Sequence, residues 1–169
     1  MRLFHFPDCL QEASYMDNIA RIASFSINHD KLKPGAYVCR VDGDVTTYDL
    51  RHRCPNTDDL IDNSTLHSLE HMFATYIRNG VLRDQIIYYG PMGCQTGFYL
   101  LIRNADNAVV LSEIKKTCER ILAHEGPVFG AARIECGNYR NLSLEAAKKE
   151  AARYLAELNS REQTFIYEV

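Results

Sequence analysis

The pattern of apolar and polar positions divides the chain into short runs rich in aromatic and β-branched residues and longer runs with apolar residues at helical spacing. The first short runs lie within residues 36–51, on either side of Asp42-Gly43-Asp44. Glycine readily adopts the positive φ of a tight turn, so this region predicts a β-hairpin. Two more strands are expected at residues 86–89 and 96–102, because the Pro91-Met92-Gly93-Cys94-Gln95 segment requires a turn between them.

In the longer runs, apolar residues recur every three or four positions, which predicts amphipathic helices. Ser64 is the expected N-cap of the first helix, which ends at Asn79-Gly80. The second helix is expected from Ser112 to Gly126-Pro127, and the third over residues 143–158. A shorter helix is expected around residues 16–23.

A hairpin followed by interspersed strands and helices predicts an α+β fold, in which an antiparallel sheet packs against helices. The chain has 169 residues, of which 46% are hydrophobic, so it is large enough to bury the core of a single domain. No repeat, low-complexity tract or linker interrupts the chain. Motifs from any part of it can therefore meet in one site.

Charge and composition argue against several classes of partner. The net charge of -3, from 22 acidic and 19 basic residues, gives no positive field for nucleic acid or anionic lipid. No stretch approaches the roughly 20 apolar residues that cross a bilayer, and the N-terminus is too interrupted for a signal peptide. We therefore expect a cytoplasmic protein that binds neither nucleic acid nor membranes and keeps its six cysteines as thiols.

One segment, His67-Ser68-Leu69-Glu70-His71, has the composition of a metal site. Two histidines four positions apart lie on the same side of a helix, so both rings can bind one metal ion. Candidates for a third ligand are Cys136, Cys94 or a distant carboxylate. The motif alone also fits two ordinary histidines, or an inverzincin-type zinc peptidase in which the glutamate is the general base.

Three motifs follow one another along the chain: residues 64–71 (Ser-Thr-Leu-His-Ser-Leu-Glu-His), residues 90–100 with their Pro-Met-Gly-Cys-Gln-Thr-Gly run, and Cys136-Gly137. Their order and spacing resemble those of the S-ribosylhomocysteine lyase (LuxS) family. Residues 24–29 and the Tyr-Asp-Leu-Arg run of residues 48–51 are similar to further segments of that family. The resemblance covers nearly the whole chain after the N-terminal segment.

The resemblance implies a set of roles around one metal ion. His67, His71 and Cys136 would bind one divalent metal per subunit, for which we expect iron(II), with zinc or cobalt as alternatives. Glu70 and Cys94 would be the acid/base pair of the reaction.

The implied reaction splits S-ribosylhomocysteine into homocysteine and 4,5-dihydroxy-2,3-pentanedione, the precursor of the autoinducer-2 signal. Ser24, His29 and Arg51 would bind this substrate, and the active sites would lie between the two subunits of a homodimer. For Arg51 the alternative is a solvated strand end, because it belongs to the basic run Arg51-His52-Arg53.

Some positions depart from the family pattern. Tyr88 occupies the place of a usual aspartate, and Ala132-Arg133 replaces an Asn-Glu pair shortly before the ligand cysteine. We expect residues 24–169 to form the catalytic domain and residues 1–23 to be an extension that the family lacks. The departures favour a non-catalytic metal-binding homologue as one alternative, whereas a peptidase would leave Cys94 without a role.

Overall fold

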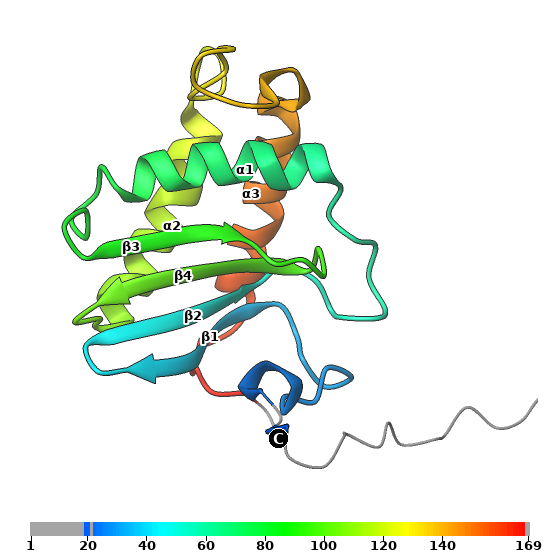
Figure 1. Cartoon of the computed structure of the whole chain (residues 1–169), viewed down its shortest axis with the longest axis vertical. Coiled ribbons are helices and arrows are strands. Elements are labelled where there is room, and N and C mark those ends of the chain that lie inside the picture. The colour runs from blue at the N-terminus through cyan, green and yellow to red at the C-terminus, as the bar shows by residue number, and fades with distance from the viewer. Residues whose placement is uncertain (1–18, 21, 168–169) are drawn as a thin grey trace, which may run out of the picture.

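A computed structural model describes residues 19–20 and 22–167 of the chain, and within them one antiparallel sheet forms the centre of the fold (Figure 1). Its strands lie in the order β1-β2-β4-β3. Their bounds are β1 Gly35–Asp42, β2 Val45–Arg51, β3 Ile86–Pro91 and β4 Gly97–Arg103. The helices are α1 Asn63–Ile77, α2 Asn107–Ala123 and α3 Leu144–Ser160, with short 3-10 turns η1 Ala23–Phe25 and η2 Tyr139–Asn141. The predicted α+β fold, hairpin and strand pair are confirmed.

The helices cover one face of the sheet. Figure 1 shows α2 and α3 behind it, while α1 runs along the β3 edge and packs against both of them. Tyr48 and Leu50 of β2 are fully buried in the core beneath these helices, together with Phe98 and Leu100 of β4. Since successive side chains on a strand point to opposite faces, Asp49 and Arg51 must lie on the other face, which we call the open face.

The helix starts differ from the predicted ones because aspartates cap them. Asp62 caps α1, with its Oδ1 atom accepting from the Thr65 amide at 3.0 Å, so the predicted Ser64 cap is wrong. Ser64 instead donates to the carbonyl of Asn141 at 2.7 Å and ties α1 to η2. Asp106 caps α2, which therefore begins five residues before the predicted Ser112, at Asn107.

Two further findings concern the ends of the chain and membranes. The helix expected around residues 16–23 falls mostly outside the described residues. Just after it, within the described part, Ala23–Phe25 form a 3-10 turn. Near the other end, Phe165 forms an unexpected parallel bridge with Tyr37 of β1. None of the helices described here is long and apolar enough to cross a bilayer.

Candidate active site

The two histidines of the motif lie one turn apart on α1, on the side of the helix away from its buried Leu66 and Leu69. Their ring centroids are 4.6 Å apart and the ring planes are nearly perpendicular, at 88°. The loop between α2 and α3 brings Cys136 to the same point. Ligand atoms of His67, His71 and Cys136 all lie within 4.8 Å of one another, and no other such group of potential ligands occurs in the part of the chain that the structure describes.

The surrounding hydrogen bonds orient these donors. The Nδ1 atom of His71 lies 2.7 Å from the carbonyl of Phe129, which leaves its Nε2 atom for a metal. Gly130 has a φ of 68°, and a Cβ atom there would lie 3.1 Å from that Nδ1 atom, so the loop approaches the ring closely. The Sγ atom of Cys136 accepts from the amide of Asn138 at 3.4 Å.

The chemistry of this donor set fits a transition metal. Two imidazoles and a thiolate are ligands for zinc, iron(II) or cobalt, and three protein ligands leave a position for another oxygen. Burial and the neighbouring His71 lower the pKa of His67, so its ring is neutral at pH 7, which is the form that binds metal. Glu70, on the same turn, is half-buried beside the histidines.

A second cluster forms around Cys94, whose exposed thiol lies in the turn between β3 and β4. Its Sγ atom lies 3.0 Å from Oγ1 of Thr96 and 3.8 Å from Nη1 of Arg51. Burial raises the pKa of the thiol, but the hydrogen bonds from Thr96 and the charge of Arg51 outweigh it, and the net pKa is lowered. Cys94 is therefore prepared to act as a thiolate base.

The basic run after β2 is buried, so the alternative of a solvated strand end for Arg51 is wrong. Arg51, His52 and Arg53 are 3%, 2% and 6% exposed. Glu150 of α3 lies 2.7 Å from Nδ1 of His52 and 2.6 Å from Nη2 of Arg53, and it balances the charge of Arg53. Asp49 balances Arg51, which presents only one edge of its guanidinium toward Cys94.

Ser24 and His29 lie far from the metal-binding group along the sheet. Ser24 belongs to η1, which contacts β1, and the ring of His29 contacts the carbonyl of Ile27 at 2.9 Å. Strand β1 is one edge of the sheet, whereas α1 lies against β3 at the other edge. Within one chain, Ser24 and His29 are therefore not brought to the proposed metal ligands.

Sequence reasoning missed three residues of the Cys94 cluster. Thr96 and Asp49 both lie inside segments that resemble the family, so the motifs contained the signal for them. The third, Tyr167, donates to Asp49 from near the C-terminus at 3.0 Å, and nothing in the local sequence pattern predicts that contact.

An α+β scaffold that presents a His/His/Cys group is typical of small proteins with a site for one metal ion. The chain belongs to the S-ribosylhomocysteinase (LuxS) family, whose family model matches residues 22–165. Among its relatives is the S-ribosylhomocysteine lyase of Borrelia garinii subsp. bavariensis, 42% identical over 83% of this chain and 93% of the relative. Proteins of the same name from Finegoldia magna and Desulfotalea psychrophila are 40% and 42% identical, over 87% and 82% of this chain and 97% and 91% of their own lengths.

The structure gives local reasons for the two departures from the family pattern. The side chain of Tyr88 folds over Gly90, where a Cβ atom would overlap the tyrosine hydroxyl. Tyr88 can therefore take this position only because residue 90 is glycine. In the metal-site loop, the Ala132 carbonyl accepts from the amides of Glu135 and Cys136, each at 3.0 Å. Backbone groups thus shape the turn that presents Cys136, without an asparagine side chain at this position.

Proposed function

We propose that the chain is an S-ribosylhomocysteine lyase, which releases homocysteine and 4,5-dihydroxy-2,3-pentanedione by β-elimination. The observation that carries this proposal is the convergence of His67, His71 and Cys136 in a chain whose relatives bear that enzyme name. The lowered pKa of Cys94 supplies a base of the kind that the reaction needs.

The chemistry explains why these groups suit the reaction. A thioether leaves readily only when a carbonyl stands two carbons away, so the sugar carbonyl must first move along the chain by two enolisations. A divalent metal supplies Lewis-acid stabilisation of the negative charge that develops on oxygen. Cys94 would take a proton from one carbon and return it to the next, and Glu70 would exchange protons with the oxygens.

The proposed ligand set is His67, His71 and Cys136, holding one metal ion per subunit. We propose iron(II) as the native metal, as the family resemblance implies. Zinc and cobalt are the alternatives, because imidazole and thiolate donors suit all three metals. Metal content after anaerobic purification tests this choice.

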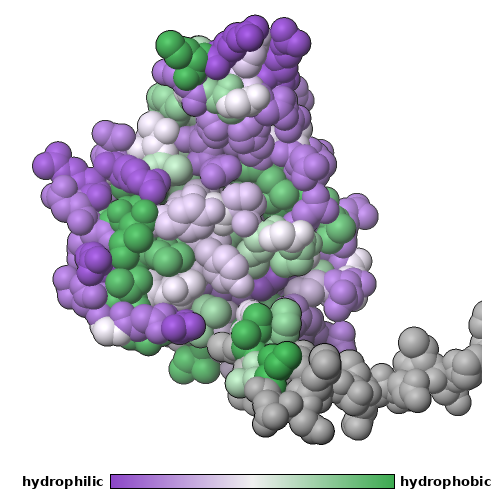
Figure 2. Space-filling model, in the orientation of Figure 1, coloured by the Kyte–Doolittle hydropathy of each residue, from purple (hydrophilic) through white to green (hydrophobic). Residues whose placement is uncertain are grey.

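We further propose a homodimer in which each active site takes residues from both subunits. Ser24 and His29 lie at the β1 edge and the metal-binding group lies beyond the β3 edge, so a partner that packs in the opposite direction on the open face would bring the two together. Figure 2 shows this face, where green hydrophobic patches are exposed among polar residues. Val41, Ile87 and Tyr88, on the two edge strands, are 60%, 40% and 47% exposed.

The activity is tested by the release of free thiol from S-ribosylhomocysteine by anaerobically purified protein. We expect rapid release by the parent and by a Cys54→Ala control, which removes a thiol outside the proposed site. Release should be abolished in the Cys94→Ala and His67→Ala variants. If both variants kept parent rates, the assigned roles would be wrong.

Subunit mixing tests the shared site. His29→Ala and Glu70→Ala homodimers should each have low activity, whereas heterodimers of the two should recover one intact site. A mixture that remains as inactive as its components, despite verified exchange of subunits, would contradict the shared site.

A further inference from the structure

A charged pair is buried on the open face of the sheet, which none of the described α-helices covers. Asp49 and Arg51 of β2 are 1% and 3% exposed. Tyr37 and Tyr99 are the cross-strand partners of Asp49 on β1 and β4. A third tyrosine, Tyr167, comes from the C-terminal segment, which runs beside β1 in red in Figure 1.

The C-terminal segment is attached to β1 by backbone and ring contacts. The amide of Val38 donates to the carbonyl of Phe165 at 2.9 Å. Two residues later, the Tyr167 ring stacks on Tyr37, with centroids 4.8 Å apart and planes at 8°. This stack places the Tyr167 hydroxyl 3.0 Å from Oδ2 of Asp49.

Both oxygens of Asp49 hold the guanidinium of Arg51. The Nε–Oδ1 distance is 3.1 Å and the Nη2–Oδ2 distance is 2.6 Å, which is the two-point geometry that fixes the plane of a guanidinium. The remaining nitrogen, Nη1, donates to Thr96 and points to Sγ of Cys94 at 3.8 Å. An arginine side chain without these contacts would have to lose rotamer freedom to reach the same position.

We propose that Asp49 and Tyr167 are positioning residues that hold the Arg51 guanidinium against the Cys94 thiol, so that the C-terminal segment is part of the active-site structure. The inference rests on the proposed function only for the catalytic role of Cys94. Its geometric content, a braced cation beside that thiol, is independent of the substrate.

The surrounding titratable groups are consistent with this arrangement. Besides Asp49, Arg51 and Cys94, they are Tyr37 and Cys39 of β1, Tyr99 of β4 and Tyr167. Burial and the neighbouring Asp49 raise the pKa of Tyr167, so its phenol stays protonated and can only donate to the carboxylate. Burial also raises the pKa of Cys39, which leaves Cys94 as the lowered thiol of the two.

The test measures the thiol itself in the metal-loaded full-length protein. The pH dependence of iodoacetamide alkylation of Cys94 is followed by mass spectrometry, with Cys94→Ser as the background. Asp49→Asn keeps the shape of the side chain but weakens the grip on Arg51, and should raise the midpoint by about one pH unit, which is about tenfold slower alkylation below the midpoint. Tyr167→Phe keeps the ring stack on Tyr37 and should raise the alkylation midpoint by a smaller amount. Ile166→Ala, at an exposed neighbouring side chain, should leave it unchanged.

The outcomes separate this inference from the proposed function. If Asp49→Asn fails to fold, Tyr167→Phe decides, because it retains the stack on Tyr37. Parent-like midpoints in the folded variants, or a lower midpoint in Asp49→Asn from the loss of its negative charge, would overturn the positioning role. Raised midpoints in a protein that releases no homocysteine would leave the positioning role intact and reject the lyase.

Discussion

The Nε2 atom of His67 lies 3.3 Å from the Sγ atom of Cys136, although the two residues are 69 positions apart in the chain. Two side chains of the proposed ligand set, one from a helix and one from a distant loop, thus lie side by side. Cys136→Ser should lower metal affinity by more than about tenfold, because weaker changes around metal ligands already have effects of that size. Metal per chain after dialysis, measured by inductively coupled plasma mass spectrometry, checks this prediction.

A matched control is Cys54→Ser, which changes another half-buried thiol and should retain the parent metal content. If Cys136→Ser also kept its metal, the third ligand would have to be a different residue. Chelation of the parent should remove activity, and iron(II) added without oxygen should restore it.

Arg51→Lys should make the Cys94 thiol less acidic. The pKa of this thiol is lowered in the folded protein, so the thiolate is present above that value and is lost as the pH falls through it. Lysine keeps the charge but lacks the planar guanidinium, whose several N–H groups contact Asp49 and Cys94 at the same time. A hydrogen bond to a charged group contributes about 1.5–3 kcal/mol, and one pKa unit corresponds to about 1.4 kcal/mol. Loss of the contact should therefore raise the alkylation midpoint by about one to two pH units. An unchanged midpoint would mean that Thr96 alone lowers the pKa.

Glu150→Gln should destabilise the fold by about 3–5 kcal/mol, because it leaves the buried Arg53 without its counter-charge. Burial opposes ionisation of Glu150, but hydrogen bonds from His52 and Arg53 lower its pKa from 4.5 to about 2. A depressed carboxylate pKa contributes stability that is full above about pH 4.5 and is lost as the pH falls toward 2. Urea unfolding at fixed protein concentration should show a larger acid-dependent loss of stability in the parent than in the variant, where only other carboxylates such as Asp62 contribute.

Tyr89→Phe should leave stability unchanged or raise it by up to about 1 kcal/mol. Among the described side chains, the Tyr89 hydroxyl is buried without a hydrogen-bond partner. Its ring stacks on Phe73 and Phe98 at 4.3 and 5.1 Å between centroids, and phenylalanine can keep both contacts. A clear loss of stability in thermal unfolding would indicate that the hydroxyl has a partner such as a buried water.

The sequence was most informative where a local pattern determines local structure. Apolar spacing predicted the helix that carries His67 and His71, and their own spacing placed both rings on one side of it. The turn residues around Gly43 and Cys94 predicted where strands reverse. Helix starts were less predictable, since Asp62 and Ser64 are both suitable caps and only packing decides between them.

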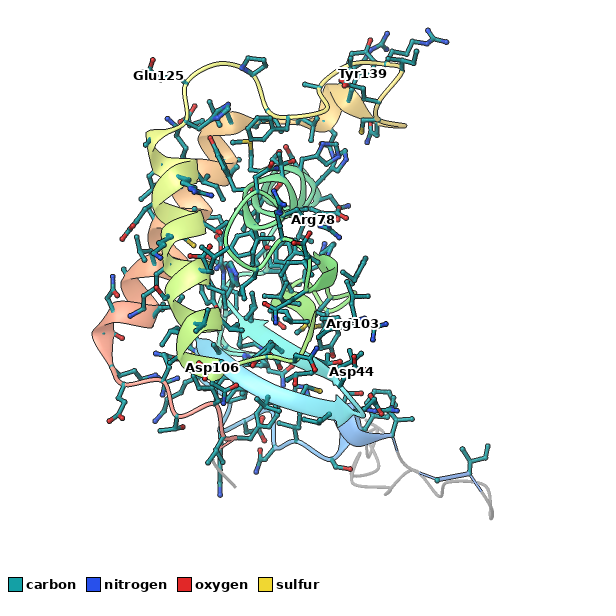
Figure 3. All side chains as sticks on the ribbon, turned by 90° about the vertical axis from the view of Figure 1, so that its left-hand side faces the viewer. Asp44, Arg78, Arg103, Asp106, Glu125 and Tyr139 are labelled. Atoms are coloured by element: carbon teal, nitrogen blue, oxygen red, sulfur yellow. The ribbon has the colours of Figure 1, made fainter. Side chains whose placement is uncertain are left out.

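Contacts between distant segments could not be predicted from local patterns. Glu150 neutralises Arg53 from 97 residues away, so a run that looks solvated in the sequence is buried in the fold. Figure 3 shows that the loop between the labelled Glu125 and Tyr139 projects beyond the helices. This loop carries Cys136, whose thiol meets His67 and His71 of α1. The position of Cys136 follows from that loop, and the family resemblance, not its spacing, singled it out.

The lyase is tested most directly by identifying the five-carbon product formed from S-ribosylhomocysteine. Beta-elimination consumes no water and should give homocysteine and a vicinal diketone in equal amounts, which o-phenylenediamine traps as a quinoxaline. Hydrolysis of the carbon–sulfur thioether bond would instead consume one water and give ribose with homocysteine. Equal amounts of homocysteine and trapped diketone are the result that we predict, whereas ribose, or no thiol release by folded and metal-loaded protein, would contradict the assignment as a lyase.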